Sequence, residues 1–252
     1  MIVTDEDVAR VFDGIAAEYE AQLARNPVAG YMRAELHAHF ARTFHRDEHI
    51  LDVTAGTGID AFFLAARGVR VPAIDISPAM IAELRKSLAR RGLPIDARVL
   101  AAERLRELEE CYDGAISTFA GLNLIADLPR VAENLARVVR PGGRVILHGL
   151  NRFCLWQAAA NALRRRGERS GALRVGSERV AHFLYDPFAL WRAAFAPHFK
   201  LRQAYGLSVV AAPALVKRAG RLAPATFWAD RVVGRMLPAA GDFFVLDLER
   251  RA

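Results

Sequence analysis

The first part of the chain carries apolar residues at helical spacing. They recur every three or four positions, at Val8, Val11, Phe12, Ile15 and Tyr19. This spacing places side chains on one face of a helix, so a single amphipathic helix is predicted over residues 5–24. Asn26-Pro27 ends it, and a second helix is predicted over residues 28–44.

From residue 49 onward, short apolar runs of strand length alternate with helical segments. Strands are predicted at 49–53, 69–74, 97–100, 114–118 and 144–148. Helices are predicted between them, at 59–67, 78–91 and 130–139. Alternation of this kind is typical of a parallel sheet covered by helices on both faces, with right-handed connections.

Beyond Asn151 the pattern is looser. A basic loop carries Arg164, Arg165, Arg166 and Arg169. A helix is predicted at 187–196, and late strands are predicted at 198–210 and 242–248, with a helical insert around 213–238 between them. The sequence thus predicts a seven-stranded, mostly parallel α/β sheet in one domain. That domain would comprise an N-terminal helical segment (1–47), a ligand-binding core (48–151) and a cap with late strands (152–252).

Composition sets broad limits on the protein class. With 252 residues, 53% of them hydrophobic, the chain can bury a sizeable core and is not expected to be disordered. Cys111 and Cys154 form neither a metal-ligand spacing nor a disulfide framework. No signal peptide and no apolar run of about 18 residues is visible, so we expect a cytoplasmic protein with no membrane-spanning segment.

The charge balance is basic, with a formal net charge of +7. Such a balance can indicate nucleic acid or an anionic membrane surface as partner. The excess is mostly arginine spread through the chain, which favours a solvated basic surface. No aromatic residues interleave with the basic loop, so nucleic acid is the less favoured partner. A membrane surface stays open as a partner, as does a homodimer.

Ligands of open α/β sheets bind beyond the carboxyl ends of the strands, where this chain has a glycine turn. Gly56 and Gly58 allow a sharp turn and a close approach of ligand to backbone. The run Gly56 to Ala61 also fits the G-x-G-x-x-A dinucleotide fingerprint. Asp75 ends the next strand, where a carboxylate can accept hydrogen bonds from ribose hydroxyls.

Asp52 separates the two cofactor classes that such a turn can serve. It lies at the end of the first strand, ahead of the glycines. A carboxylate there would repel the pyrophosphate of a nicotinamide dinucleotide. It would attract the ammonium group of a cofactor that carries an amino acid. The alternative is that Asp52 caps nearby backbone N–H groups.

Four segments of the chain resemble those of the class I S-adenosyl-L-methionine (SAM)-dependent methyltransferases and follow one another in the order typical of that family. Ile50 to Gly58 resembles the first motif of that family and Val71 to Met80 the second. Arg137 to Leu147 resembles the helix, turn and strand that precede the substrate side. Val11 to Glu20 resembles the helix often found ahead of the core. The resemblance covers about residues 10–150 and implies a Rossmann-like fold with SAM as cofactor.

The resemblance also implies which residues hold the cofactor. Asp52, Gly56 and Gly58 would hold its methionine end, and Asp75 would bind the ribose hydroxyls. Tyr19 would close over the amino-acid end, although an ordinary core aromatic is an equal alternative.

The adenine side is implied in the same way. Ile76 and Met80 would pack near the adenine, with core packing as the alternative. After the third strand, Ala102 and Glu103 stand where the family often has an aspartate, so either Glu103 or the backbone would read the adenine. Thr118, at the end of the fourth strand, completes the predicted set.

Thr54 departs from the family pattern, which usually has glycine at this position. Its β-branched side chain restricts the backbone. The departure puts the local cofactor contact in doubt rather than the fold.

Methyl transfer from a sulfonium is an in-line displacement, so the protein mainly positions the reactants. A base is needed only for a poorly acidic acceptor. His148 is the candidate base and Asn123 a candidate hydrogen-bond partner of the acceptor; a satisfied strand-end histidine and a helix cap are the alternatives. No metal is expected, because residues two apart, such as His37 and His39, do not share a helix face.

Apolar and aromatic residues gather between residues 152 and 238, which favours a cap over an apolar pocket. The sequence therefore predicts methyl transfer to a small apolar, aromatic or lipid-like acceptor, as in secondary metabolism. Two alternatives stay open. One is an NAD(P)-dependent oxidoreductase, which Gly56 to Ala61 favours and Asp52 opposes. The other is an RNA-directed methyltransferase or RNA-binding module, suggested by the charge.

Overall fold

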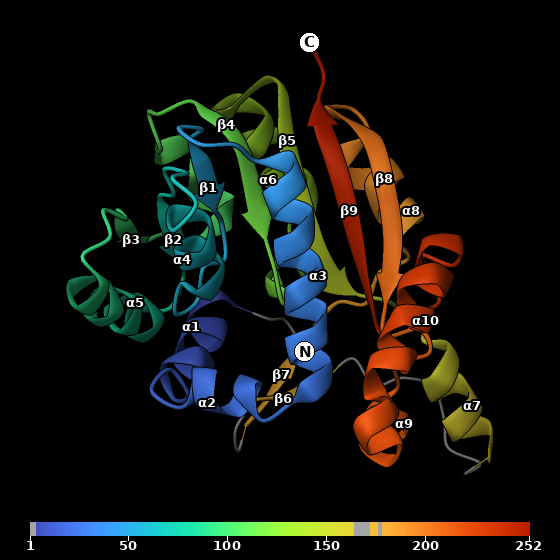
Figure 1. The fold of residues 1–252 in the computed structure, drawn as a ribbon. Coiled ribbons are helices and arrows are strands. Elements are labelled where there is room, and N and C mark those ends of the chain that lie inside the picture. The colour runs from blue at the N-terminus through green and yellow to red at the C-terminus, as the bar shows by residue number, and fades with distance from the viewer. Residues whose placement is uncertain (1–3, 164–171, 176–177) are drawn as a thin grey trace.

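The computed structural model describes residues 4–163, 172–175 and 178–252. Within them, the main sheet has seven strands in the order β3-β2-β1-β4-β5-β9-β8 (Figure 1). Neighbouring strands are parallel from β3 to β5, whereas β9 is antiparallel to both of its neighbours. The predicted seven-stranded, mostly parallel α/β fold is confirmed. The strands are β1 (Ile50–Asp52), β2 (Ala73–Asp75), β3 (Ala97–Val99), β4 (Tyr112–Ser117), β5 (Val139–Leu150), β8 (Phe199–Leu207) and β9 (Phe243–Arg250).

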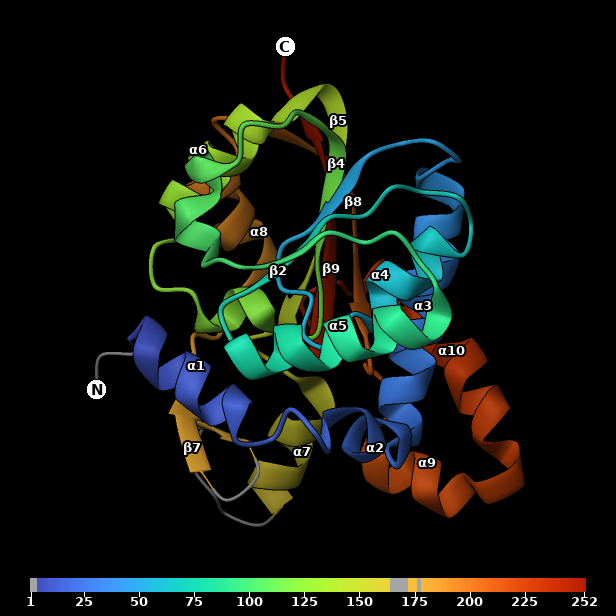
Figure 2. The same cartoon turned by 90° about the vertical axis from the view of Figure 1, so that its left-hand side faces the viewer.

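Helices cover both faces of this sheet (Figure 2). On one face lie α3 (Pro27–Thr43), α4 (Ile59–Ala65) and α5 (Pro78–Arg91). On the other lie α6 (Leu128–Val138) and α8 (Pro187–Leu190), which continues as a π-helical turn through Phe195. The short 3-10 helices η1 (Ala102–Glu107) and η2 (Gly121–Leu124) follow β3 and β4.

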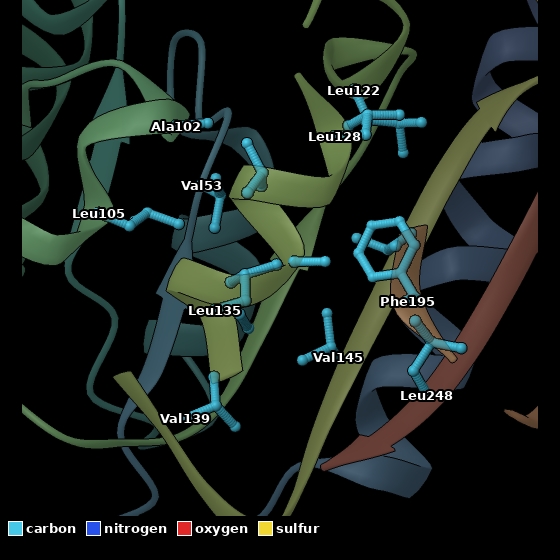
Figure 3. Close-up of a cluster of buried hydrophobic side chains, with 14 of the residues drawn as sticks. Val53, Ala102, Leu105, Leu122, Leu128, Leu135, Val139, Val145, Phe195 and Leu248 are labelled. Carbon is cyan, nitrogen blue, oxygen red and sulfur yellow. The ribbon is translucent and has the colours of Figure 1, made fainter. Parts of the chain in front are cut away.

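The core between the sheet and α6 shows why the apolar runs predicted the strands. Leu135 of α6 packs in one cluster with Val53, Val145 and Leu248 from the sheet and with Phe195 (Figure 3). Strands covered on both faces are apolar throughout rather than alternating. All seven residues from Val145 to Asn151 are accordingly buried.

Helix α5 begins and ends where the sequence predicts. The Ser77 hydroxyl accepts a hydrogen bond from the Met80 N–H at 3.0 Å, and Pro78 takes the first helical position. Both are favoured helix-start features. Gly92 ends the helix with a positive φ of 64°, which glycine adopts without strain.

The single helix predicted over residues 5–24 is wrong. The chain forms α1 (Asp5–Asp13) and α2 (Tyr19–Ala24), with turns between them. Gly14, a poor helix former, follows Asp13, whose carboxylate accepts hydrogen bonds from the Ser77 hydroxyl and the Ala79 N–H. Tertiary contacts with the start of α5 thus end α1 early.

The late part of the chain adds elements that the pattern did not predict. A two-stranded antiparallel sheet pairs β6 (Ala172–Val175) with β7 (Glu178–Ala181), and α7 (Leu155–Leu163) precedes it. The predicted helical insert consists of α9 (Pro213–Ala219), the 3-10 turn η4 (Gly220–Leu222) and α10 (Ala223–Met236). The basic loop Arg164–Arg169 lies outside the described residues. In the described part, no helix has the length and apolar character needed to cross a membrane.

Candidate functional site

A cavity lies beyond the carboxyl ends of β1, β2 and β4, where open α/β sheets bind ligands. Most of the sequence-predicted cofactor residues line it: Tyr19, Thr54, Gly56, Asp75, Ile76, Met80, Ala102, Glu103 and Thr118. Asp52 and Gly58 do not line it. Apolar side chains from α1 and from the segment after β4 complete the wall, at Val8, Phe12, Phe119, Leu124 and Ile125.

Asp75 is held in place by backbone groups. Its carboxylate accepts hydrogen bonds from the Gly56 N–H at 2.8 Å and the Ser77 N–H at 2.9 Å. Burial raises the pKa of Asp75, although these two hydrogen bonds act in the opposite direction. Each carboxylate oxygen can accept more than one hydrogen bond. A fixed acceptor with spare capacity therefore faces the cavity.

The two positions of the turn require glycine for different structural reasons. Gly56 has a positive φ of 53° and lines the cavity directly. Gly58, with a φ of 87°, caps the start of α4. A Cβ at Gly58 would lie 2.8 Å from Leu84 Cγ, so this glycine allows α4 to pack closely on α5.

Thr54 is accommodated by a glycine elsewhere in the chain. Its hydroxyl lies 2.8 Å from the Ser117 hydroxyl. A Cβ at Gly121 would come within 2.5 Å of Thr54 Cβ, so only a residue without a side chain fits opposite the threonine. The larger residue in the turn is thus matched by the smallest one after β4.

Asp52 lies beneath the turn rather than on the cavity wall. Its carboxylate is fully buried, and neither oxygen has a hydrogen-bond partner among the described residues. Burial raises its pKa well above the ordinary value, and the nearby charges of Asp60 and Asp75 raise it further. An unpartnered buried carboxylate is costly, and a positive charge brought close to it would lower that cost.

Tyr19 covers the turn from the N-terminal side. Its ring lies 3.8 Å from the position that a Cβ at Gly56 would take. Burial raises the pKa of Tyr19 to about 12, so its hydroxyl is neutral at physiological pH. Together with Phe12 and Val8 of α1, it forms the wall of the cavity on this side.

A buried ionic network beside the cavity was not predicted from the sequence. Asp60 of α4 accepts hydrogen bonds from Arg33 Nη1 and His37 Nε2, both at 2.7 Å, and from the Thr118 hydroxyl at 2.6 Å. Burial raises the pKa of Asp60, but the Arg33 charge and the hydrogen bonds outweigh it and hold the pKa at about 2. The Arg33 guanidinium also lies 4.0 Å from the centre of the Phe119 ring.

The sequence contains one sign of this network: Arg33 and His37 are four residues apart, a spacing that places both side chains on the same face of α3. His39 faces elsewhere, toward Tyr205 and Asp247. The partner of the first pair, Asp60, follows the glycine turn, and only the folded chain brings it to α3.

Neither candidate catalytic residue lines the cavity. His148 is fully buried within β5, where its Nδ1 accepts a hydrogen bond from the Phe119 N–H at 3.1 Å. Its ring stacks on Phe243, and its Nε2 has no partner among the described residues. Burial lowers the pKa of His148 to about 3, which makes it a poor base.

Asn123 forms hydrogen bonds with backbone groups of two other segments. Its amide donates to the carbonyl oxygens of Leu150 and Phe183, at 3.2 and 2.6 Å. Its Oδ1 accepts from the Leu150 N–H at 2.8 Å. The side chain therefore fastens the segment after β4 to the end of β5 and to the segment that follows β7.

Comparisons with known proteins address the same region. Residues 50–143 match the family described as a methyltransferase domain. A demethylmenaquinone methyltransferase of Thermobifida fusca is 34% identical over 145 residues, which are 56% of this chain and 60% of that protein. A ubiquinone biosynthesis O-methyltransferase of Methylocella silvestris is 33% identical over 168 residues, which are 60% and 65% of the two chains. The chain thus spans less than two thirds of the length of these relatives.

Solved structures share the fold over most of the chain. The cyclase SpnF has a TM-score of 0.63 at 18% identity, covering 99% of this chain and 97% of that one. A geranyl diphosphate C-methyltransferase from Streptomyces coelicolor A3(2), in complex with S-adenosyl-L-homocysteine, has a TM-score of 0.59 at 13% identity, covering 92% and 84%. Because one is a cyclase and the other a methyltransferase, the fold alone does not determine the reaction.

Proposed function

We propose that this chain is a class I SAM-dependent methyltransferase that transfers a methyl group from SAM to a small apolar acceptor, a reading that the match of residues 50–143 to a methyltransferase domain supports. The observation that carries the proposal is the cavity beyond β1, β2 and β4, lined by Gly56, Asp75 and Tyr19. The relatives named above are methyltransferases, which favours this reaction over the oxidoreductase alternative.

The residues present fit the cofactor group by group. The fixed carboxylate of Asp75 suits the ribose hydroxyls, and the apolar side chains of Ile76 and Met80 suit the adenine ring. The unpartnered carboxylate of Asp52 suits the positive charge of the methionine end. Tyr19 covers that end. When bound, SAM supplies the activated methyl group.

The chain itself then has three tasks: it orients the cofactor, excludes water and positions the acceptor. Phe12, Phe119 and Leu124 give the cavity an apolar wall that suits a flat or lipid-like acceptor. Two curated relatives are named for quinone pathways, so reduced quinone precursors are the acceptors to test first. His148 and Asn123 serve structural roles in this proposal.

Calorimetry with S-adenosyl-L-homocysteine tests the cofactor site. Asp75→Asn removes the charge that strengthens hydrogen bonds to the ribose, and we expect it to weaken binding by about 1.5–3 kcal/mol. The matched control is Asp113→Asn at the start of β4, the opposite end of the sheet, where the carboxylate bonds to Arg140. Equal affinity of both variants, or binding of NADH in place of the SAM product, would contradict the proposal.

A second assay tests the acceptor class with radiolabelled SAM. Label should pass to a reduced quinone precursor bearing a lipid tail and not to RNA. Transfer to RNA alone would favour the RNA-directed alternative instead.

A further inference from the structure

Helix α10 presents a stripe of large apolar side chains to solvent. Trp228, Val232 and Met236 follow one another at a spacing of four, so they share one helix face. Their exposed fractions are 65%, 44% and 74%. A contiguous exposed stripe of this kind marks an interaction site more often than scattered single residues do.

The opposite face fixes the orientation of α10. The Phe227 ring stacks on Tyr31 of α3 with ring centres 4.4 Å apart. The fully buried Asp230 carboxylate accepts hydrogen bonds from the Tyr31 hydroxyl at 3.0 Å and from the Ser208 N–H at 2.8 Å. Because these contacts hold the inner face, the helix cannot rotate its outer stripe into the core.

The same segment of the chain also carries basic side chains. Lys217 and Arg218 lie in the last turn of α9, Arg221 lies in η4, and Arg235 lies in the last turn of α10. In the described part of the chain, none of these four has a carboxylate within 4.0 Å. The α9–α10 segment contains one acidic residue, the buried Asp230.

We propose that this face, formed by Trp228, Val232 and Met236 of α10, by the exposed Leu222 just before α10 and by the basic residues of the α9–α10 segment, docks on the surface of an anionic lipid bilayer. Helices with Trp and Leu on one side and Lys or Arg beside them lie at the boundary of headgroups and acyl chains. The basic side chains then meet anionic headgroups. A second copy of the chain suits the face less well, because a two-fold interface would bring the same basic residues together.

The position of the face suits a lipid-like acceptor. Figure 1 shows α9 at the same end of the sheet as α1 and α2, which carry cavity-lining residues. A bilayer docked there would hold an apolar acceptor at the end of the sheet where the cavity lies. This benefit rests on the proposed function, whereas the docking itself rests only on the surface of α9 and α10.

Co-sedimentation of the full chain with vesicles tests the docking. We expect binding to phosphatidylglycerol-containing vesicles, weaker binding at high salt, and little binding to pure phosphatidylcholine. The double variant Trp228→Ser, Met236→Ser should lower the partition coefficient at least tenfold, and Arg218→Glu with Arg221→Glu should do the same. The matched control, Val99→Ser, alters an exposed apolar residue on β3 at the far edge of the sheet and should leave partitioning unchanged.

Two further measurements keep the outcomes separate. Calorimetry with S-adenosyl-L-homocysteine should give the same affinity for all three variants, so a failed cofactor site and a failed docking face are distinguishable. Unchanged partitioning of the Trp228 and Met236 variant would overturn the proposal. Sedimentation velocity that shows a dimer broken by this variant would also overturn it, and would assign the face to a second copy.

Discussion

Three buried ionisable side chains near the carboxyl end of the sheet differ in their pKa shifts and in the partners that compensate their charge. Asp60 stays charged because Arg33 and His37 surround it, and its pKa is about 2. His148 is neutral, with its pKa lowered to about 3 by burial, and its Nε2 finds no partner within residues 4–163, 172–175 and 178–252. Asp52 has no side-chain hydrogen-bond partner in the described part of the chain, and burial raises its pKa. Of the three, Asp52 has most to gain from a cationic ligand.

The neutral state of His148 predicts a pH-dependent stability. Its folded pKa of about 3 lies below the ordinary value of 6.5, so below pH 6.5 the unfolded chain binds the extra proton. The free energy of unfolding should therefore fall as the pH drops from 6.5 toward 3, by up to about 1.4 kcal/mol per pH unit from this residue. Urea unfolding of the wild type and of His148→Asn at several pH values measures the difference in slope.

The comparison uses slopes because His148→Asn also changes packing. An asparagine keeps an acceptor for the Phe119 N–H but does not titrate. Asp60, with its pKa lowered to about 2, acts below pH 3.8, outside most of this window. Parallel stability profiles for the two proteins between pH 6.5 and 4 would show that His148 is protonated in the folded state.

At the scale of elements, α1 is a short helix that covers the cavity and is held by one side chain at its end. The Asp13 carboxylate bonds to the Ser77 hydroxyl at 2.6 Å and to the Ala79 N–H at 2.9 Å, at the start of α5. A carboxylate is also favoured at a helix N-terminus by the helix dipole. Asp13 therefore couples the cover of the cavity to the core.

Asp13→Ala should release this coupling. We expect a loss of stability of about 1 kcal/mol, the usual cost of removing a cap, and faster amide hydrogen exchange in α1. If SAM binds as proposed, S-adenosyl-L-homocysteine should also dissociate faster. The matched control is Asp7→Ala in the same helix, an exposed carboxylate whose partners among the residues described are Thr4 and Arg10. Equal exchange rates in α1 for both variants would contradict the coupling.

The same elements show how far the sequence predicts the fold. Helix α5 carries its own start and stop signals, Ser77-Pro78 and Gly92, so its bounds follow from local chemistry. The break after Asp13 depends on α5, which lies 64 residues away. Sequence patterns therefore predict helix ends that are determined by nearby residues, and they miss helix ends that are determined by contacts with residues far along the chain.

The candidate site divides in the same way. Gly56 and Asp75 are visible in the sequence because Gly56 lies in the turn after β1 and Asp75 ends β2. The match of Thr54 with Gly121 and the pairing of Arg33 with Asp60 are not visible, since each joins separate elements. Burial also explains why His148 is a poor choice of catalytic base. Its position at the end of a predicted strand suggests that it reaches the ligand, whereas the rings of Phe119 and Phe243 enclose its side chain.

At the scale of the whole molecule, a buried ionic cluster joins an early helix to the last strand. His39 of α3 lies 2.8 Å from the Asp247 carboxylate of β9, and Arg144 of β5 binds the same carboxylate. Burial raises the pKa of Asp247, but the hydrogen bonds from His39 and Arg144 outweigh it and hold the pKa below the ordinary value. The cluster thus fastens α3 to the antiparallel end of the sheet.

Removing one partner from a buried ion cluster leaves the others uncompensated, so Asp247→Asn should cost about 3–5 kcal/mol of unfolding free energy. Because the folded pKa of Asp247 is depressed, its contribution should be present above the unfolded value of 3.8 and lost as the pH falls below it. The matched control is Glu249→Gln on the same strand, whose partly exposed pair with Arg202 should cost at most about 1 kcal/mol. Urea unfolding at pH 7 compares the two, and similar losses would show that the cluster adds nothing beyond a surface pair.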